Sequence, residues 1–584
     1  MSLGRALSLL TLALLAGYAH AAVFHVAQND PAASDEGPGT AEAPWRTVAK
    51  AAQTSEAGDR VVIHEGVYRE WAEPRNSGRP GAPIIYEAAE GETVVMTGAD
   101  VLTGWERIPG ERPIYRIPWS AEFVVNTVDG KPIYHHPADE EHVRSGRAEQ
   151  LIVDSQVWDS PQLVLSLDAM ERGTFFPDVE RDTLYLRLTD DSDPNAHAIE
   201  GSTRGMVFGT HPWRGGHTFD HVWVRGIAFR YAATFAQRPA VWLLGKHNVL
   251  EDCVIEWMSG GGVGVGPEGG VLRRCVIRDC GHVGGAATGT RFVNEDCLWE
   301  GNCRKPISRG WDAGGVKICH SYHGAFERCT FRNNGGPGLW FDIDDADVTV
   351  RNCLFEDNEQ HGVFIEISRD IYVLNNRFFR NGLRGEGLAG WSVAGLTLAE
   401  SRSCVVAHNL FMGNKDGLAL REQGPRYVDT PDLGEVPFRN VGHVICDNIS
   451  VLNQGYQLGL WYDSAFFGMH PGEREQYKTE EEHAAAVQRD RPDYWFDPLQ
   501  QGLLIDRNLY WAAEGQKLVL YGCPWRARSR EFADLAAFTE ATGFERAGRV
   551  EDPGLQPTPG GWALPKESEL LKLGLGPRSW GPIR

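Results

Sequence analysis

The sequence predicts an all-β fold, a right-handed parallel β-helix (solenoid) with an inserted β-sandwich-like domain. The first observation is a repeat from residue 221 onward, in which short apolar strands and turns recur without intervening helices. The second is one side-chain position within that repeat, which recurs at spacings of 22, 22, 32, 24 and 24 residues. The third is a segment of longer, alternating strands that precedes the repeat. A period of roughly 20 to 50 residues is typical of stacked coils that share one core.

The recurring position is held first by cysteine and later by other polar residues. Its members are Cys253, Cys275, Cys297, Cys329, Cys353, Arg377, Asn409, Asn448 and Asn508. Identical side chains that stack at a bend form an internal ladder. Because ladder side chains point the same way, whereas a disulfide needs converging Cβ vectors, we expect reduced, buried thiols at these five cysteines. The chain has 11 cysteines but no CxxC spacing, so the sequence predicts no metal site.

Residues 1–21 have the pattern of a cleavable secretory signal peptide. Arg5 precedes an apolar run over residues 6–16, and residues 19–21 fit an A-x-A cleavage site. The run is too short to span a bilayer, and no later run is long enough. We therefore expect a secreted or periplasmic protein without a membrane partner.

The next segment, residues 22–105, predicts an N-terminal cap and the first coils. Apolar strands are expected at residues 23–26, 60–64, 66–70, 84–88 and 94–98. A short Ala-rich helix, opened by residues 44–47, lies between the first two of them. This order of strand, capping helix and short strands resembles the N-terminal turns of many secreted right-handed parallel β-helices.

Residues 106–205 form the inserted domain in this prediction. Hydrophobic and polar residues alternate there over longer strands, and an Asp-Gly hairpin signal occurs at residues 129–130. A long decorated loop is the alternative, although structureless loops of such length are uncommon. The main solenoid then covers residues 206–525, interrupted at 468–500 by a charged, helix-prone loop that would be either a lid or a solvated helix. Residues 526–584 are expected to cap the last coil.

The composition narrows the classes of partner. The 584 residues include 57 Lys and Arg against 79 Asp and Glu, a formal net charge of −22, and such a surface repels nucleic acids. Hydrophobic residues make up 42% of the chain, which is enough for a large core. The 19 Trp suit a carbohydrate partner, because indole rings lie against sugar rings as well as in cores. The Gly runs are expected to be coil turns rather than phosphate loops, so no nucleotide cofactor is predicted.

Two successive coils contain the candidate chemistry. Residues 338–344 (GLWFDID) lie over residues 362–368 (GVFIEIS) at an offset of 24 residues. Side chains alternate between the two faces of a strand, so one set from both strands points outward. The expected outward set is Trp340, Asp342, Asp344, Phe364 and Glu366. If the coils are in register, Asp342 lies beside Glu366.

The same outward strip, followed along the solenoid, gives further candidates for contact with a substrate. The candidate substrate-binding residues of the strip are Lys317, His320, Trp340, Asp344, Phe364 and Arg421. An open face of Trp, carboxylates and a few cations suits a sugar polymer or oligomer. A solvated face with unrelated charges is the alternative, although Trp340 and Phe364 would then expose apolar rings unless a loop covered them.

Two carboxylates one coil apart indicate a specific reaction. Carboxyl groups on neighbouring parallel strands should lie about 5 Å apart, the separation of a retaining rather than an inverting glycosidase. One attacks the anomeric carbon while the other protonates the leaving oxygen and then activates water. Asp342 suits the nucleophile, whereas Glu366, below Phe364 and beside a like charge, should have a raised pKa and suits the acid/base. Surface coincidence and Ca²⁺ ligation are the alternatives for such a pair.

Three motifs resemble glycoside hydrolase family 120: GGVKICH at 314–320, GLWFD at 338–342 and GVFIEIS at 362–368. That family consists of β-xylosidases built on a right-handed β-helix with an inserted β-sandwich. The resemblance implies that Asp342 is the nucleophile and that Glu366 is the acid/base.

The resemblance extends loosely over most of the mature chain and has further consequences. It implies that Asp312 corresponds to a family carboxylate that precedes the GGxK motif and contacts substrate, and it is compatible with a homo-oligomer. This chain departs from the family by having Asp rather than Glu at that upstream position. It is also more acidic after the nucleophile, at Asp344, Asp345 and Asp347. These departures leave the identity of the sugar open.

Two other functions remain alternatives to a hydrolase without a cofactor. A polysaccharide lyase acting on a uronate polymer would use Lys317 or Arg421 as the base, with Ca²⁺ held by carboxylates such as Asp344 and Asp345. A non-catalytic carbohydrate-binding β-helix would use the Trp residues as sugar platforms. Ca²⁺ dependence separates the first alternative from a hydrolase, and absence of turnover separates the second.

Overall fold

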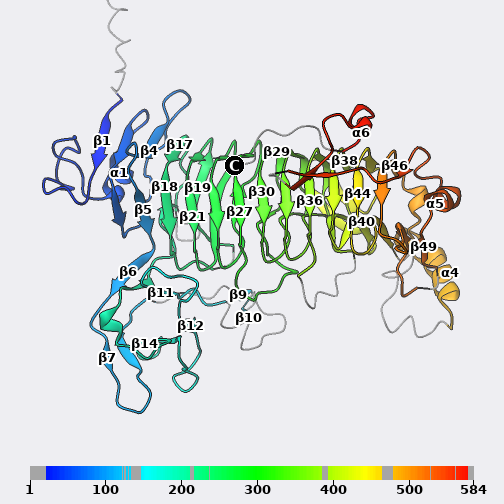
Figure 1. Ribbon diagram of the computed structural model, residues 1–584. Helices are drawn as coiled ribbons and strands as arrows, with labels where there is room; N and C mark the ends of the chain where they lie inside the picture. The colour runs from blue at the N-terminus through cyan, green and yellow to red at the C-terminus, as the bar shows by residue number, and fades with distance from the viewer. Residues whose placement is uncertain are drawn as a thin grey trace, which may run out of the picture.

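The computed structural model confirms the parallel β-helix (Figure 1). It describes residues 21–576, apart from residues 122, 124–126, 129–130, 133–145, 211–215, 236, 385–391, 463–477, 527 and 559–560. The predicted signal peptide therefore lies outside the described residues, except for its last position. The described helices are α1 Val48–Thr54, α4 Glu480–Asp490, α5 Leu535–Thr542 and α6 Glu569–Lys572, with 3-10 turns at Pro194–Ala196, Pro492–Tyr494 and Pro498–Gln500. Within these described residues, no helix is long and apolar enough to cross a membrane.

Three long sheets run along the solenoid, and their strands are parallel except for the last strand of the third sheet. The first has 13 strands, from β1 (Val23–Val26) to β46 (Leu504–Asp506), and the second has 13, from β3 (Gly66–Tyr68) to β50 (Arg549–Val550). The third sheet contains the candidate site. Its eight strands are β28 Val316–Ile318, β31 Leu339–Asp342, β34 Val363–Glu366, β37 Ala394–Ala399, β40 Asp416–Glu422, β45 Leu458–Tyr462, β48 Val519–Tyr521 and β49 Arg530–Phe532. The same wall is continued toward the N-terminus by β16 Phe208–Gly209, β19 Pro239–Lys246, β22 Gly261–Glu268 and β25 Gly285–Ala287.

The solenoid interior is filled by side chains that stack from coil to coil. One row of rings, Trp299, Phe331, Phe355, Phe378 and Phe411, has successive centroid distances of 4.7, 4.8, 4.9 and 4.6 Å. These distances match the ~4.8 Å spacing of hydrogen-bonded strands, because each coil adds one ring to the row. Each fully buried ring contributes roughly 1.5–3 kcal/mol of transfer free energy, so the repeat itself is the main source of stability.

The cysteine column forms a ladder of buried, free thiols, as predicted. The thiol of Cys253 donates to the Glu251 carbonyl at 3.2 Å. The column continues through Asn376 rather than the expected Arg377, because the Asn376 side-chain oxygen accepts the Cys353 amide at 2.8 Å. An asparagine can accept from one coil and donate to another, whereas an arginine has no acceptor.

A second ladder, which the sequence reasoning missed, runs beside the third sheet. Its members are Asn302, Asn334, Asn358, Asn381, Asn414 and Asn453. The side-chain amide of Asn358 donates to the Asn381 side-chain oxygen and to the Phe331 carbonyl, both at 2.9 Å. Buried polar groups are satisfied in this way along the bend that leads into the third sheet.

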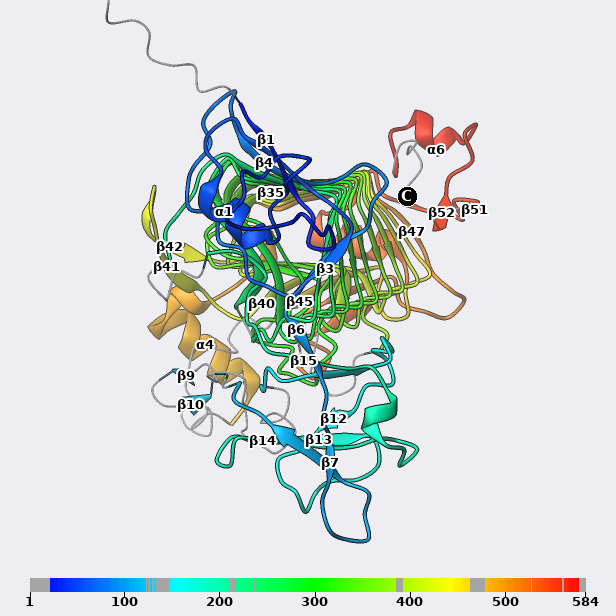
Figure 2. The same cartoon turned by 90° about the vertical axis from the view of Figure 1, so that its left-hand side faces the viewer.

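The inserted segment lies beside the N-terminal half of the solenoid, on the side of the third sheet (Figures 1 and 2). It forms a three-stranded antiparallel sheet and a five-stranded sheet around a small core of its own. Their strands are β6 Ala99–Leu102, β15 Ile199–Ser202 and β11 Leu151–Val153, then β12 Gln162–Leu163, β13 Thr174–Asp178, β14 Thr183–Arg187, β8 Tyr115–Pro118 and β7 Glu106–Arg107. Strand pairing of the insertion thus begins at Ala99, before the predicted start at residue 106.

Helix α4 lies at the C-terminal end of the solenoid, as Figure 1 shows, and Figure 2 shows the hairpin of β41 (Arg426–Thr430) and β42 (Gly434–Phe438) on the same side as α4. The hydroxyl of Tyr427 in the hairpin lies 3.3 Å from the Asp493 carboxylate. The helix-prone part of the predicted 468–500 loop therefore folds as α4, while residues 468–477 lie outside the described residues. The third sheet is thus bounded by the insertion at one end and by α4 at the other.

Candidate active site

The structure places Asp342 opposite Glu366, in register on the adjacent parallel strands β31 and β34. Hydrogen-bonded strands lie ~4.8 Å apart, so the two carboxylates start from neighbouring backbone positions on one face. Leu339 and Phe341 point into the core and are fully buried. The 24-residue offset of the two motifs therefore gives the juxtaposition that the alternation predicts.

The outward face is more enclosed than the expected open strip. Trp340 is 3% exposed and Phe364 is 5% exposed, because the two rings lie 5.3 Å apart and pack with Ala399. The ring of His361 stacks on Phe364 at 4.6 Å. The two aromatic residues thus form a packed wall beside the carboxylates.

Each carboxylate of the pair has a cation of its own. Lys317 Nζ lies 2.9 Å from an Asp342 oxygen and 3.9 Å from the centre of the Trp340 ring. Arg421 lies 3.3 Å from a Glu366 oxygen and 5.0 Å from the centre of the Phe364 ring. The strip therefore contains two side-by-side ion pairs, each over an aromatic ring.

Burial sets the proton affinity of the acids in this site. Burial raises the pKa of Glu366, Arg421 acts in the opposite direction, and the charge of Asp342 adds to the increase. Burial also raises the pKa of Asp312 to about 6, although the Lys317 ammonium favours its ionised form. The raised pKa of Glu366 agrees with the expectation from its apolar neighbour and like-charged partner, and it allows this carboxyl group to hold a proton.

Asp312 lies in the same cluster. Its carboxylate is 3.8 Å from His282, whose ring is 3% exposed and whose two nitrogens have no hydrogen-bond partner among the described residues. Burial lowers the pKa of His282 to about 3, with Lys305, Arg309 and Lys317 adding to the effect. A neutral imidazole therefore lies at the N-terminal side of the acid pair.

The prediction that Asp344 points outward, on the face that would contact a substrate, is wrong. Ile343 and Asp344 have left-handed backbone angles, φ 59° and 58°, so the strand ends at Asp342 and the alternation stops there. Asp344 is fully buried and accepts a hydrogen bond from the Tyr322 hydroxyl at 2.7 Å, with Arg369 at 3.4 Å. Ile343, expected inside, is instead 37% exposed.

His320 is likewise at a turn. It has a φ of 49°, its side chain is exposed, and its amide donates to the Ile343 carbonyl at 3.0 Å. The other predicted strip residues lie on strands of the third sheet, in register with the pair: Lys317 opposite Trp340, and Arg421 opposite Ala399 next to Glu366.

Two further acids support the pair: Asp345, which the sequence analysis named only as part of the acidic run and as a candidate Ca²⁺ ligand, and Glu400, which it did not identify. Asp345 is fully buried and accepts the backbone amides of Asp342 at 3.0 Å and Ser321 at 2.8 Å. Glu400 is fully buried, lies 4.0 Å from Arg421 and accepts the Gln423 amide at 2.6 Å. Only the Asp344–Asp345 run marked the first, whereas nothing in the local sequence around Glu400 distinguishes a buried acid from a surface one.

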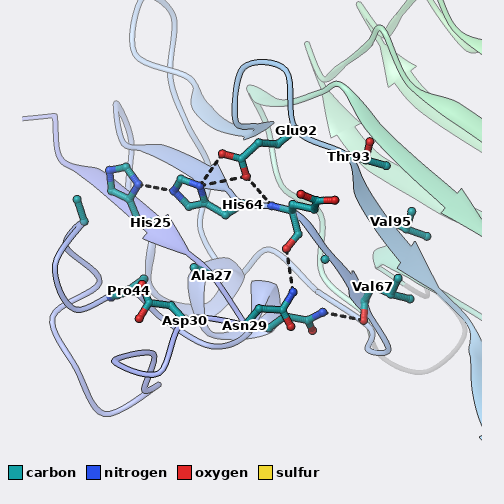
Figure 3. A pocket seen from close by; sticks show the side chains of 14 residues that line it. His25, Ala27, Asn29, Asp30, Pro44, His64, Val67, Glu92, Thr93 and Val95 are labelled. Atoms are coloured by element: carbon teal, nitrogen blue, oxygen red, sulfur yellow. Dashed lines mark hydrogen bonds and ion pairs between the residues drawn. The ribbon is translucent and has the colours of Figure 1, made fainter.

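A cavity of about 850 Å³ lies several coils away, at the N-terminal end of the solenoid (Figure 3). It contains a relay in which a His25 ring nitrogen lies 3.0 Å from His64, and His64 lies 3.2 Å from Glu92. The sequence analysis singled out none of these three residues. The surrounding coils are held in register by pairing of strands β1, β2 (Arg60–Ile63) and β4 (Ile84–Ala88). The cavity is thus far from the Asp342/Glu366 pair.

Comparisons with known proteins agree with this architecture. A family model described as a right handed beta helix region matches residues 216–411. The chain is a right-handed parallel β-helix. The solved complex of XylC with xylose superimposes on this β-helix with a TM-score of 0.60 and 19% identity, covering 87% of each chain. A solved glycoside hydrolase has a TM-score of 0.42 and 12% identity, over 72% of this chain and 95% of its own.

A curated relative is similar over a short stretch. The uncharacterized protein YwoF of Bacillus subtilis (strain 168) is 39% identical over 87 residues. That stretch is 15% of the β-helix chain and 18% of YwoF, so the chain spans less than a fifth of this relative.

Proposed function

We propose that the chain is an exported glycoside hydrolase that cleaves β-linked oligosaccharides with retention, as a β-xylosidase does. The observation that carries the proposal is the register of Asp342 with Glu366 on adjacent parallel strands. Side chains that leave one face of strands ~4.8 Å apart can hold their carboxyl groups about 5–5.5 Å apart, the spacing of retaining enzymes. The signal-like residues 1–21 and the resemblance of the flanking motifs to glycoside hydrolase family 120 support the same proposal. The proposed partner is an oligosaccharide, the proposed assembly is a homo-oligomer, and no cofactor takes part.

In the first step, a carboxylate oxygen of Asp342 attacks the anomeric carbon. Glu366 transfers its proton to the glycosidic oxygen as the bond to the leaving group breaks, which leaves a glycosyl ester on Asp342. In the second step, Glu366 takes a proton from water, whose oxygen displaces Asp342 and releases the sugar with its original configuration. Lys317, 2.9 Å from Asp342, would stabilise the Asp342 carboxylate as it leaves the anomeric carbon in this second step.

The electrostatics support these two roles. Glu366 has a buried setting that raises its pKa, which favours the protonated form needed in the first step. The Asp342 carboxylate forms an ion pair with the Lys317 ammonium at 2.9 Å, the group that would receive it again when the glycosyl ester breaks. Trp340 and Phe364 provide an apolar wall that would exclude water from the reacting bond.

A calcium-dependent lyase fits the contacts less well. In that reading Asp344 and Asp345 would be Ca²⁺ ligands together with the catalytic pair. Asp344 is instead engaged by Tyr322 and Arg369, and Asp345 by two backbone amides. These acids therefore support the protein framework, and the hydrolase remains the proposal.

A panel of aryl β-glycosides, led by the β-xyloside and run with and without EDTA, tests the proposal. We expect release of the aryl group that EDTA does not change, and NMR detection of the β-anomer as the first product. Glu366→Gln should slow hydrolysis of poor leaving groups by about 10²–10⁴-fold, the contribution of a general acid. If no glycoside is hydrolysed, and if uronate polymers gain ultraviolet absorbance only when Ca²⁺ is added, the protein is a lyase. No turnover of either substrate class would leave a binding protein.

A further inference from the structure

A second hollow lies between the inserted segment and the solenoid, and we call it the cationic cavity. Its volume is about 370 Å³, and its charged lining residues are Glu149 from the insertion and Arg304 and Lys305 from the solenoid. Contacts across it include Gln150, which donates to the Trp257 carbonyl at 2.9 Å. The cavity therefore depends on both parts of the chain and is not visible in either sequence segment alone.

The two cations of this cavity are held by neutral acceptors, although the Asp279 carboxylate acts electrostatically on Arg304 and the Glu149 carboxylate on Lys305. Lys305 donates to the Arg147 carbonyl at 2.6 Å and to the Ser259 hydroxyl at 2.9 Å, which are neutral acceptors. Arg304 donates to the Asp279 backbone carbonyl at 2.5 Å and lies 4.6 Å from the centre of the Trp257 ring. No salt bridge within 4.0 Å is formed by either side chain in the part of the chain that the structure describes.

The acid that lines the cavity is already neutralised. Glu149 accepts from the Arg147 guanidinium at 3.0 Å, so its charge is satisfied within the insertion. The cavity thus has an excess of positive charge in a chain whose formal net charge is −22. Partly buried cations lose hydration, and a cation left without a carboxylate is costly unless a ligand supplies the anion.

A series of contacts leads from the cationic cavity toward the acid pair. Lys305 donates its amide to the Gly281 carbonyl, and the next residue, His282, lies 3.8 Å from Asp312. Asp312 and Asp342 in turn influence one another electrostatically. The Lys305 ammonium contacts Ser259, which precedes β22. Since β22, β25, β28 and β31 follow one another, three coils, or roughly 15 Å along the axis, separate this contact from Asp342. A short oligosaccharide covers that distance.

An aromatic side chain lies beside this cavity. Trp158 is 74% exposed and packs edge-on against Trp257 at 4.8 Å, and its neighbour Val157 lines the cavity. An exposed indole ring offers a flat apolar face with a polar N–H, against which a sugar ring can lie. The combination of a ring with two cations suits a sugar that bears a carboxylate.

We propose that the cationic cavity binds the carboxylate of a uronic acid residue in an oligosaccharide that extends from the Asp342/Glu366 pair toward the insertion. The substrate class is then an acidic, branched or mixed oligosaccharide rather than a purely neutral one. The inference rests on the proposed hydrolase only for the position of the cleaved bond. Lys305 and Arg304 recognise the charge, and the insertion determines how many sugar residues are bound.

Calorimetry on the full-length Glu366→Gln protein tests the site, with xylotriose carrying a glucuronate substituent compared with unsubstituted xylotriose. We expect the acidic sugar to bind at least 10-fold more tightly. Lys305→Gln should reduce that preference by about 10- to 100-fold, the effect of losing a hydrogen bond to a charged group. Lys305→Arg should retain the preference, which excludes collapse of the cavity as the cause. Lys246→Gln, a surface lysine paired with Glu268 at 2.9 Å, is the matched control and should change nothing.

The protonation state of Lys305 provides a second measurement. Burial lowers the pKa of Lys305 to about 7, with Arg304 and Arg147 adding to the effect and Glu149 opposing it. Only the ammonium form attracts a carboxylate, so the preference for the acidic sugar should fall as the pH rises from 6 to 8. Arg304→Gln should weaken the preference but retain this pH dependence.

Equal affinity for the two oligosaccharides, or a preference that survives both Lys305→Gln and Arg304→Gln, would overturn the inference. Competition by inorganic sulfate as strong as that by free glucuronate would overturn the assignment to a sugar carboxylate. If no glycoside is hydrolysed while the Lys305-dependent preference persists, the proposed hydrolase falls and the binding site stands. If neutral glycosides are hydrolysed and no acidic sugar is preferred, the reverse holds.

Discussion

At the scale of single residues, Glu366 experiences two opposing influences. Burial raises its pKa and Arg421 acts against that increase from 3.3 Å. In the free enzyme, kcat/KM falls on the alkaline side as the acid loses its proton, so this limb reports the pKa of Glu366. Arg421→Gln removes the opposing cation, and we expect the alkaline limb of the kcat/KM profile to move to higher pH.

A matched variant tests whether distance and burial decide this effect. Arg426 lies 4.0 Å from Glu366, but its side chain is 52% exposed and is therefore screened by solvent. Arg426→Gln should move the alkaline limb less than Arg421→Gln does. Equal movement in both variants, or none in either, would contradict the assignment of Glu366 as the titrating acid.

The proposed nucleophile, Asp342, can be tested by removing its carboxylate. Asp342→Ala should lose nearly all turnover while the protein still folds, with a lowered melting temperature because Lys317 loses its ion-pair partner in a largely buried site. Azide should restore activity and yield a glycosyl azide of inverted configuration, since it replaces the missing nucleophile. Asp347→Ala, in the same acidic run but 56% exposed, should retain full activity. Normal turnover in Asp342→Ala would refute the nucleophile assignment.

At the scale of the repeated elements, burial in the cysteine ladder should protect the thiols from chemical reagents. All 11 cysteines are free, and Cys319 is the exposed one. Burial raises the pKa of thiols such as Cys280 and Cys404, each to about 12, which keeps them protonated and unreactive. A thiol reagent should therefore modify at most one cysteine in the native protein and 11 after denaturation, as counted by mass spectrometry.

The asparagine ladder gives a prediction about stability. Asn358→Ala leaves the Asn334 amide and the Phe331 carbonyl without their partner, both in a buried site. Each unsatisfied buried group costs about 1–3 kcal/mol, so the unfolding free energy should fall by at least that amount. Asn29→Ala, outside the ladder and solvent-exposed, is the control in urea titrations followed by circular dichroism. A loss no larger than that of the control would mean that the ladder is not a source of stability.

At the scale of the whole molecule, buried carboxyl groups couple stability to pH. Burial raises the pKa of Glu400 to about 8 from the usual 4.5. Between pH 4.5 and 8 the native state binds this proton and the unfolded state does not, so stability is lost as the pH rises. Glu400→Gln removes the contribution of this group to the pH dependence. The unfolding free energy of the variant, relative to that of the native protein, should increase by about 1.4 kcal/mol for each pH unit across this window.

Thermal melts at pH 5 and pH 8 measure that difference. The melting temperature of Glu400→Gln should exceed that of the native protein only slightly at pH 5 and most strongly near pH 8. Glu481→Gln, an exposed acid on α4, is the control and should follow the native protein at both values. A variant difference that does not change with pH would show that Glu400 does not titrate in this range.

The solenoid was predictable because its signals are local and repeated. A strand of alternating residues defines its own faces, and the 24-residue offset is enough to align Asp342 with Glu366. The prediction was wrong where backbone angles break the alternation. Ile343 and Asp344 turn the chain through left-handed conformations, which moves Asp344 from the strip to a buried pair with Tyr322.

The sequence by itself determined the parallel β-helix, the free thiols of its ladder and the neighbours on one strand face. Those features follow from periodicity, because each coil repeats the environment of the coil before it. The tertiary structure alone decided the enclosure of Trp340 and Phe364, the partners of Asp342 and Glu366, and the cationic cavity. These depend on residues far apart in the chain, such as Lys305 with Arg147 from the insertion. Burial and Coulomb interactions act through space, so the sequence order does not contain them in readable form.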